Sequence, residues 1–397
     1  MKKLLCFVLA AMLMMVSASA FADTILNPTE KRGIQLQKVG DNTVEAGISP
    51  TTGRTLSTLS VPEGFTGMAK TGRYLPMMAT IGNDDGGVGN RAPWGAAYAD
   101  VVYETLLYRA SGPTTRLLFV FNDIIPDSLG PIRSVRVTHV WLREEWGAAF
   151  MYHGQQTYDG SSAVEEFRLL GHDYIFDPLL FNGWAGAKDW ERYFTRRSGT
   201  VSPYNRNVNP VGIYHLVDDS YVAPNHTYKF TDEIPEGDPA LNVTVTWRGG
   251  DRDNVSGSSL IYDATQNAYL RYMRYGNELR PWTDRDEGSQ IAFANVIVQF
   301  TKSEFNHRRD APIQRVIGKD LTAAEGNADF FMGGKHVSGY WKRDSATDRT
   351  IFYGPDGDEV SLQRGKTLII IFPDDNTLLV DDYAPSGSSV SYSDKLP

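Results

Sequence analysis

Cysteine is almost missing from this chain, since Cys6 is the only one among its 397 residues. Cys6 lies within an N-terminal segment that we predict to be removed, so the mature protein is expected to contain no cysteine. Such a protein forms no disulfide bond, uses no thiol nucleophile and binds no zinc through thiolates. Its stability must come from a hydrophobic core, which a chain of this length can bury.

Long hydrophobic runs are missing as well, apart from one at the N-terminus. Two lysines precede the apolar run at 4–16, and small residues with A-x-A spacing follow it at 18–22. This arrangement predicts a cleavable signal peptide over residues 1–22, because the run is short for a membrane span. We therefore predict an extracytoplasmic protein without a transmembrane segment, secreted or loosely associated with the cell envelope.

Positive charge is in deficit, with 39 Lys and Arg against 48 Asp and Glu and a net charge of −9. An acidic surface disfavours nucleic acid and anionic membranes as partners, so we predict neither. Several common motifs are also missing: the P-loop, HExxH, GxSxG, the EF-hand loop and the dinucleotide-binding glycine pattern. We predict no cofactor, and the sequence indicates no oligomeric state.

The pattern along the chain predicts two domains joined in tandem. Over 74–230, short apolar runs alternate with amphipathic stretches, which predicts an α/β domain with a mainly parallel sheet. Strands are expected at 76–82, 115–122 and 147–152, and helices at 98–109, 130–146 and 160–170. Residues 241–375 contain short strands separated by polar turns, at 243–247, 268–275, 295–300, 336–341 and 367–372, and predict a β-rich domain.

Two polar segments flank these domains. Residues 23–73 are rich in Thr, Gly, Pro and Ser, and predict an extended arm or linker. Residues 382–397 predict a disordered tail.

The segment GPIRSVR (130–136) carries the most chemical information. On the predicted helix, Arg133 and Arg136 share one face near the N-terminus, where the helix dipole disfavours cations. Their charge therefore calls for a negative partner. One alternative is internal, since Asp100 and Glu104 are spaced i, i+4 on the preceding predicted helix. The other is an anionic ligand bound by guanidinium groups and helix N–H groups.

Polar residues that follow parallel strands meet at one edge of a sheet, and this favours a site here. We predict that the ligand-binding residues are Arg133, Arg136, Asn83, Asp84, Gln155 and Arg116. The candidate acids or bases are His153, Asp100 and Glu104, although a hydrogen-bonded structural histidine is the simpler interpretation of His153. The Asn83-Asp84-Asp85 run has oxygen ligands for a hard cation, but a solvated acidic turn is favoured and no metal site is predicted.

These stretches resemble a known family, the YerB-like bacterial lipoproteins, which carry a two-part domain of unknown function. The matching stretches are ADVVYE (99–104), TRLLFVF (115–121), GPIRSVR (130–136), YHG (152–154), YLRY (269–272), ANVIVQF (294–300), GYWKR (339–343) and GKTLIIIF (365–372). The resemblance covers roughly residues 74 to 375. It implies an exported protein with an α/β part and a β-rich part, and it implies no activity.

The chain departs from this family at two points. Family members are typically anchored through a lipid-bearing cysteine, whereas Cys6 lies inside the apolar run. Members also tend to carry a Pro-His-Asn-x-Tyr element, whose counterpart here is taken to be PVGIY (210–214), without the His and the Asn. The resemblance therefore implies a released protein that binds rather than reacts.

Two functions are compatible with the sequence. The first is a non-catalytic protein that binds an anionic or sugar-rich envelope component, such as a cell-wall polymer or glycan, through an arginine-lined cleft. The second is a hydrolase that acts on a cell-wall polymer, with His153 or the Asp100/Glu104 pair as acid or base and with arginines stabilising negative charge. The 8 Trp and 20 Tyr residues either fill a large core or include a sugar-stacking surface.

Overall fold

The computed structural model describes residues 46–109, 112–184, 189–247, 257–275, 278–304, 312–373, 377–381 and 389–391. The predicted signal peptide (1–22) lies outside these residues. Within the described ranges, no helix has the length and apolar character needed to cross a membrane.

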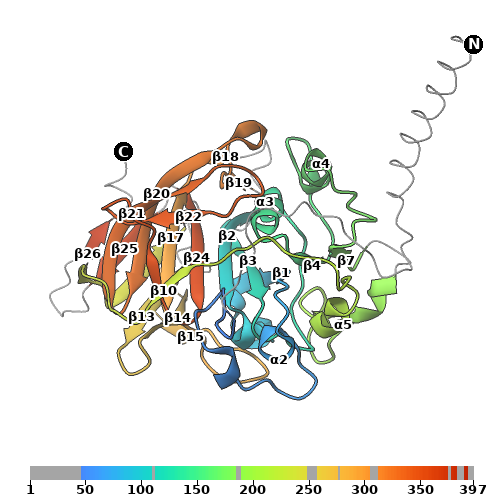
Figure 1. Cartoon of the computed structure of the whole chain (residues 1–397), viewed down its shortest axis with the longest axis horizontal. Coiled ribbons are helices and arrows are strands. Elements are labelled where there is room, and N and C mark those ends of the chain that lie inside the picture. The colour runs from blue at the N-terminus through green and yellow to red at the C-terminus, as the bar shows by residue number, and fades with distance from the viewer. Residues whose placement is uncertain are drawn as a thin grey trace, which may run out of the picture.

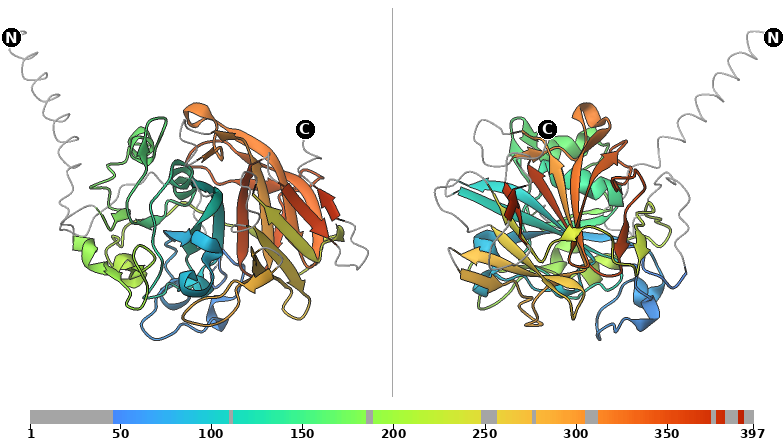
Figure 2. Two further views of the ribbon diagram at one scale, coloured as in Figure 1. Left: turned by 180° about the vertical axis from the view of Figure 1, so that it is seen from behind. Right: turned by 90° about the vertical axis from the view of Figure 1, so that its left-hand side faces the viewer.

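One mixed sheet runs through both halves of the chain (Figure 1). Its strands are β1 Met77–Asn83, β2 Val101–Arg109, β3 Gly112–Phe121, β4 Ala149–Tyr152, β7 Leu180–Asn182, β11 Asp238–Pro239, β17 Asn295–Thr301, β20 Ala324–Met332, β21 Lys335–Arg343, β22 Ile351–Tyr353 and β24 Thr367–Pro373. They lie in the order β11-β21-β20-β17-β24-β2-β3-β1-β4-β7, with β22 paired to β21. Strand β24 lies between β17 and β2 and is parallel to both, so it joins the two halves. Seen from behind, the C-terminal strands (orange to red) continue the N-terminal ones (Figure 2).

The predicted mainly parallel sheet is not confirmed. Strands β1, β4 and β7 are mutually parallel, but β3 lies antiparallel between β1 and β2. Strands β20 and β21 are antiparallel as well. A mixed sheet results because hairpins such as β2–β3 need only a short turn, whereas parallel pairs need a crossover.

The helix predicted at 98–109 is wrong, because residues 101–109 form strand β2. Val101 and Tyr103 pack in the core cluster that contains helix α3 (Val137–Trp146), and Val102 and Leu106 pack in the cluster on the other face. Burial on both faces is what a central strand requires. The apolar spacing that suggested one helix face therefore belongs to two faces of a strand.

The helix predicted to open at Gly130 begins only at Val137. Residues 130–136 are extended, with a cis peptide bond before Pro131 and β-bridges from Ile132 to β1 and from Val135 to Gln155. Arg133 therefore lies outside the helix, and Arg136 is its N-cap residue. Arg133 is therefore not exposed to the helix dipole in the way that the sequence predicts.

The remaining helices are short. The helix predicted at 160–170 is present as α4 (Ala163–Leu169), where the Ser162 side chain accepts a hydrogen bond from the Glu165 N–H as an N-cap. The others are α2 Met68–Thr71 and α5 Pro210–Tyr214, with 3-10 turns η2 Leu56–Thr58, η3 Asp84–Gly87, η4 Gly89–Arg91, η5 Ala96–Tyr98, η6 Asp189–Tyr193 and η7 Lys319–Leu321.

A second sheet and several two-stranded pairs complete the β structure. The second sheet has the order β15-β14-β13-β12-β25-β26, with β16 beside β14. Its strands are β12 Asn242–Thr246, β13 Ser258–Asp263, β14 Ala268–Tyr275, β15 Glu278–Pro281, β16 Ala292–Phe293, β25 Thr377–Asp381 and β26 Ser389–Ser391. The small pairs are β5 Thr157–Tyr158 with β6 Ser161–Ser162, β8 Phe194–Arg196 with β9 Arg206–Val208, β10 Lys229–Thr231 with β23 Ser361–Gln363, and β18 Ser303–Glu304 with β19 Ile313–Gln314. The β-rich character expected of the second half is therefore present, in strands β12, β14, β17, β21 and β24 among others.

The described part of the predicted arm, residues 46–73, packs against the body of the protein. Ser49 and Thr52 are buried, and both hydroxyl groups donate hydrogen bonds to the Asp123 carboxylate at 2.6 Å. The domain boundaries stay predictions, while the two halves share one sheet and contribute residues to both core clusters.

Candidate anion-binding site

The extended segment 130–136 crosses the sheet edge where β1 and β4 end. The Arg133 N–H donates to the Thr80 carbonyl of β1 at 2.9 Å, and the His153 N–H donates to the Arg133 carbonyl at 2.9 Å. Because β1 and β4 are parallel, Asp84 and His153 leave the sheet at the same edge. Strand β3 is antiparallel to β1 and ends where β1 begins. Residues 122–132 therefore lead the chain back to the end of β1, where Arg133 lies.

Arg133 is ion-paired with Asp84. Its Nη2 lies 2.6 Å from Asp84 Oδ2, and the side chains of the pair are 10% and 2% exposed. The Arg133 guanidinium also lies 4.7 Å from the centroid of the Tyr204 ring, a favourable cation–π distance. Of the two alternatives that the sequence leaves open, an internal partner is present for Arg133, and it is Asp84 rather than Asp100 or Glu104.

The β8–β9 hairpin adds two further arginines that the sequence analysis missed. Arg196 of β8 is directly opposite Arg206 of β9, and like charges in this register repel. Arg196 Nη1 donates only to neutral groups, Ser202 Oγ at 3.2 Å and Asn205 Oδ1 at 3.3 Å. Within the described ranges, neither arginine forms an ion pair with a carboxylate. Burial, Arg196 and Arg133 together lower the pKa of Arg206.

His153 holds Arg206 in place. Its Nε2 is in contact with Arg206 Nη1. Burial, followed by the charge of Arg206, lowers the pKa of His153 to about 4. A neutral imidazole with its proton on Nδ1 can accept from the guanidinium through Nε2. His153 therefore acts as a positioning acceptor, and its low pKa makes it a poor base at neutral pH.

An exposed indole lies beside this group. Trp184 follows β7, its side chain is 72% exposed, and its ring centroid lies 5.9 Å from that of His153. Gly154 has a φ of +81°, and a Cβ at this position would lie 2.7 Å from Trp184 Cε3. The glycine of the YHG stretch is therefore required both for its backbone conformation and for the approach of the indole. We call Arg133, His153, Trp184, Arg196 and Arg206 the arginine surface.

Three predicted ligand-binding residues bond to other protein groups, although Gln155 does so beside the arginine surface, since its partner Asn182 also accepts from the Trp184 backbone N–H at 3.0 Å. Arg136 Nη1 donates to the carbonyls of Ser134 and Val135 at 3.2 and 3.0 Å. Gln155 Oε1 accepts from Asn182 Nδ2 at 2.7 Å. Arg116 is buried on β3, and its charge lowers the pKa of His139 on α3 after the larger effects of burial and Arg136.

Asn83 and Glu104 belong to a buried network on the face of the sheet opposite helix α3. Thr115 Oγ1 donates to Glu104 at 2.8 Å and accepts from Asn83 at 2.6 Å. Arg271 of β14 donates to Glu104 at 2.7 Å, and both side chains are fully buried. Glu104 is therefore an internal counter-ion that links the two halves, rather than an accessible acid or base.

Asp100 lies at the opposite edge of the sheet. Its Oδ2 accepts from the N–H groups of Asn122 and Asp123 at 2.7 and 2.9 Å. Burial, together with the nearby Asp123 carboxylate, raises the pKa of Asp100 well above its usual range. On a strand, residues four positions apart are separated by roughly 13 Å, so Asp100 and Glu104 do not act as a pair. The three candidate acids or bases occupy three separate environments.

The described residues contain no group of three or more His, Cys, Asp or Glu side chains arranged to hold a metal ion. One further constellation, Ser338, His336 and Asp329, has the residue types of a hydrolytic triad. His336 Nε2 lies 2.8 Å from Asp329 and 3.3 Å from Ser338 Oγ. A relay uses the two ring nitrogens for the two partners, so this arrangement does not pass a proton from Ser338 to Asp329.

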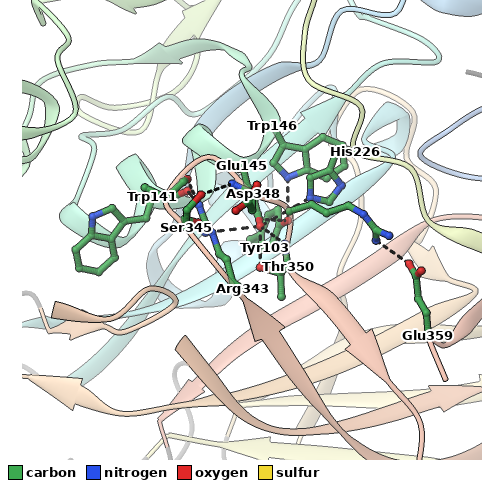
Figure 3. Close-up of polar contacts among 12 residues, drawn as sticks. Tyr103, Trp141, Glu145, Trp146, His226, Arg343, Ser345, Asp348, Thr350 and Glu359 are labelled. Atoms are coloured by element: carbon green, nitrogen blue, oxygen red, sulfur yellow. Dashed lines mark hydrogen bonds and ion pairs between the residues drawn. The ribbon is translucent and has the colours of Figure 1, made fainter. Parts of the chain in front are cut away.

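The sequence analysis also missed a run with the residue types of the family element. Residues 224–228 read PNHTY, with Asn and His exchanged relative to that element. In this run His226 stacks on Trp146 with ring centroids 3.7 Å apart, and its Nε2 lies 3.8 Å from Glu145 (Figure 3). The assignment of the element to 210–214 stays a prediction, and 224–228 has the same residue types in a different order.

Glu145 is the centre of the network in Figure 3. It accepts hydrogen bonds from Tyr103 at 2.8 Å and from Thr350 Oγ1 at 2.7 Å, and lies 3.6 Å from Arg343. Burial alone would raise its pKa, but Arg343 and the hydrogen bonds hold the pKa of Glu145 at about 2. It lines a hollow of about 360 Å³ together with Pro224, Asn225 and residues 342–353. A carboxylate with this pKa stays ionised. Because Glu145 lies on α3 and its partners Arg343 and Thr350 lie in the C-terminal half, the network joins the two halves.

Comparisons with known proteins agree with this two-part layout. The family model described as protein of unknown function (DUF3048), N-terminal domain, matches residues 65–223. The C-terminal domain model of the same family matches residues 244–369. The chain is 26% identical over 287 residues to a protein of Bacillus subtilis (strain 168) described as "Putative lipoprotein YerB", covering 70% of this chain and 76% of that protein.

A solved structure shares the fold. The crystal structure of the YerB protein from Bacillus subtilis superposes with a TM-score of 0.60 and 20% sequence identity. The match covers 81% of this chain and 95% of the other.

Proposed function

The chain belongs to the DUF3048 family, whose description assigns no activity, and we therefore propose a function from its own geometry. The protein binds an anionic, sugar-rich component of the cell envelope at the arginine surface and does not transform it. The envelope location is supported by the predicted signal peptide and by the lipoprotein description of its Bacillus relative.

The observation that carries this proposal is the unbalanced charge at the arginine surface. Arg196 and Arg206 are cross-strand neighbours, and Arg133 is close enough to lower the pKa of Arg206 further. Asp84 supplies one carboxylate for Arg133. Repulsion between like charges costs stability unless an anion offsets it, and in this region of an acidic protein the anion is expected from outside.

Binding is favoured over hydrolysis by the positions of the candidate acids and bases. His153 is neutral and in contact with Arg206, Glu104 is paired with Arg271, and Asp100 lies at the far edge of the sheet. General acid–base catalysis needs a group within hydrogen-bond reach of the substrate and with a pKa near the working pH. No pair among these residues meets both conditions.

Retention on purified cell walls tests the proposal. We expect Arg206→Gln and Arg133→Gln each to weaken retention at least about tenfold, the effect of losing one charge-assisted hydrogen bond. Arg197→Gln is the matched control, because Arg197 lies on the same hairpin but is already paired with Asp286 at 2.9 Å. Equal retention of all variants with intact thermal unfolding would contradict the proposal.

A further inference from the structure

The arginine surface has the charge to distinguish one kind of anion. We propose that its ligand is a sugar that carries a phosphate monoester, rather than a sugar that carries a carboxylate. This inference rests on the proposed function and names the chemical class of the ligand.

The charge count favours a dianion. Arg133, Arg196 and Arg206 bring three positive charges together, and Asp84 is the one carboxylate paired with them in the described part of the chain. Two positive charges are therefore left to offset. A carboxylate supplies one negative charge, whereas a phosphate monoester carries about −1.5 to −2 at pH 7.

The three guanidinium groups are held in place before a ligand arrives. Arg133 is held by Asp84, Arg206 by His153, and Arg196 by Asn205 and Ser202. Arg196 is exposed and Arg206 is half-buried, and each uses one nitrogen for these contacts, whereas Arg133 is buried and contributes mainly its charge. Fixed forks suit the three oxygens of a phosphate, and the ordering cost of binding is reduced.

The sugar is argued from Trp184. An indole that is 72% exposed leaves a large apolar face in water, and this face lies beside His153 and therefore beside Arg206. Aromatic faces pack against the C–H-rich face of a sugar ring and bury area that water otherwise contacts. A ring on Trp184 places a phosphate substituent within reach of the guanidinium groups.

Calorimetric titration of the mature protein tests the assignment with four probes: glucose 1-phosphate, inorganic phosphate, glucuronate and glucose. We expect glucose 1-phosphate to bind at least about tenfold more tightly than glucuronate, and glucose to bind weakest. Arg206→Gln and Arg196→Gln are expected to lose tenfold or more for both phosphates, while Arg197→Gln is unchanged. Glucuronate that binds as tightly as glucose 1-phosphate would overturn the assignment.

Trp184→Ala tests the sugar separately. It is expected to weaken glucose 1-phosphate to the level of inorganic phosphate and to leave inorganic phosphate unchanged. An unchanged ratio of the two affinities would remove the sugar from the proposal.

The outcomes separate this inference from the proposed function. Wall retention that depends on Arg206 but is displaced by glucuronate and not by glucose 1-phosphate refutes the phosphate alone, whereas arginine-independent retention refutes the binding function itself. Phosphatase treatment of the walls distinguishes the source of the ligand. If the treated walls no longer retain the protein, the phosphate belongs to the wall glycan. If the protein binds glucose 1-phosphate but its retention on walls does not depend on phosphatase treatment, the ligand is a soluble sugar phosphate.

Discussion

His172 shows at the scale of one residue how buried charges are balanced in this protein. Its Nδ1 lies 2.7 Å from Asp177, and its Nε2 lies 3.0 Å from Glu144. Burial alone would lower the pKa of His172, but the hydrogen bonds to these two carboxylates outweigh it and raise the pKa to about 9. The protonated imidazole therefore ties the chain after α4 to helix α3.

This raised pKa predicts a pH dependence of stability. A group whose pKa is higher in the folded state stabilises fully below its unfolded pKa, near 6.5, and loses this contribution as pH rises through 9. We expect the free energy of unfolding to fall by about 3 kcal/mol more in the wild type than in His172→Gln between pH 6.5 and 9. Urea unfolding at several pH values measures the difference, and parallel curves for the two proteins would contradict it.

At the scale of elements, local patterns predict strands well where both faces of an apolar run are buried. Strands β1, β3 and β4 follow from continuous apolar runs. Strand β2 is also apolar on both faces, but Val102 and Leu106 have the i, i+4 spacing of one helix face, and this spacing outweighed the pairing with β3, which follows directly. Arg133 and His153 could be predicted to meet because both follow predicted strands, while Arg196, Arg206 and Trp184 could not. Their positions depend on hairpin pairing and a loop, and no local period indicates either.

The turn after β4 allows a test of how one element shapes the arginine surface. Gly154→Ala adds a Cβ at φ +81° against Trp184, whereas Gly160→Ala adds one at φ +72° with no atom within 4 Å. Both substitutions carry backbone strain of about 1–3 kcal/mol, and only the first has a steric clash in addition. We expect Gly154→Ala to be the more destabilising, and Trp184→Ala to bring its cost down to that of Gly160→Ala. Thermal unfolding of the four variants measures this cycle, and additive effects of Gly154→Ala and Trp184→Ala would refute the contact.

At the scale of the whole molecule, the two family domains share both hydrophobic core clusters, since each cluster contains residues of both halves. Strand β24 of the C-terminal half is inserted between β2 and β17, and Glu104 of the first half is paired with Arg271 of the second with both side chains fully buried. Arg343 of β21 likewise donates to the Trp141 carbonyl of α3 at 2.7 Å. Neither half can close its core alone, so the chain is expected to unfold in a single cooperative transition.

Arg271→Met tests this cooperativity, because it leaves Glu104 buried without its counter-ion. Removing one partner of a buried pair costs about 3–5 kcal/mol, whereas Lys342→Met breaks an exposed pair with Glu325 and is expected to leave stability nearly unchanged. Replacing both partners, as Glu104→Gln with Arg271→Met, is expected to recover part of the loss, since no charge is then stranded in the core. Scanning calorimetry should show one transition in every variant, and Arg271→Met should move all of it to lower temperature. Two transitions, of which only the one from the C-terminal half moves, would mean that the halves are stable separately and that the shared sheet is not what holds them together.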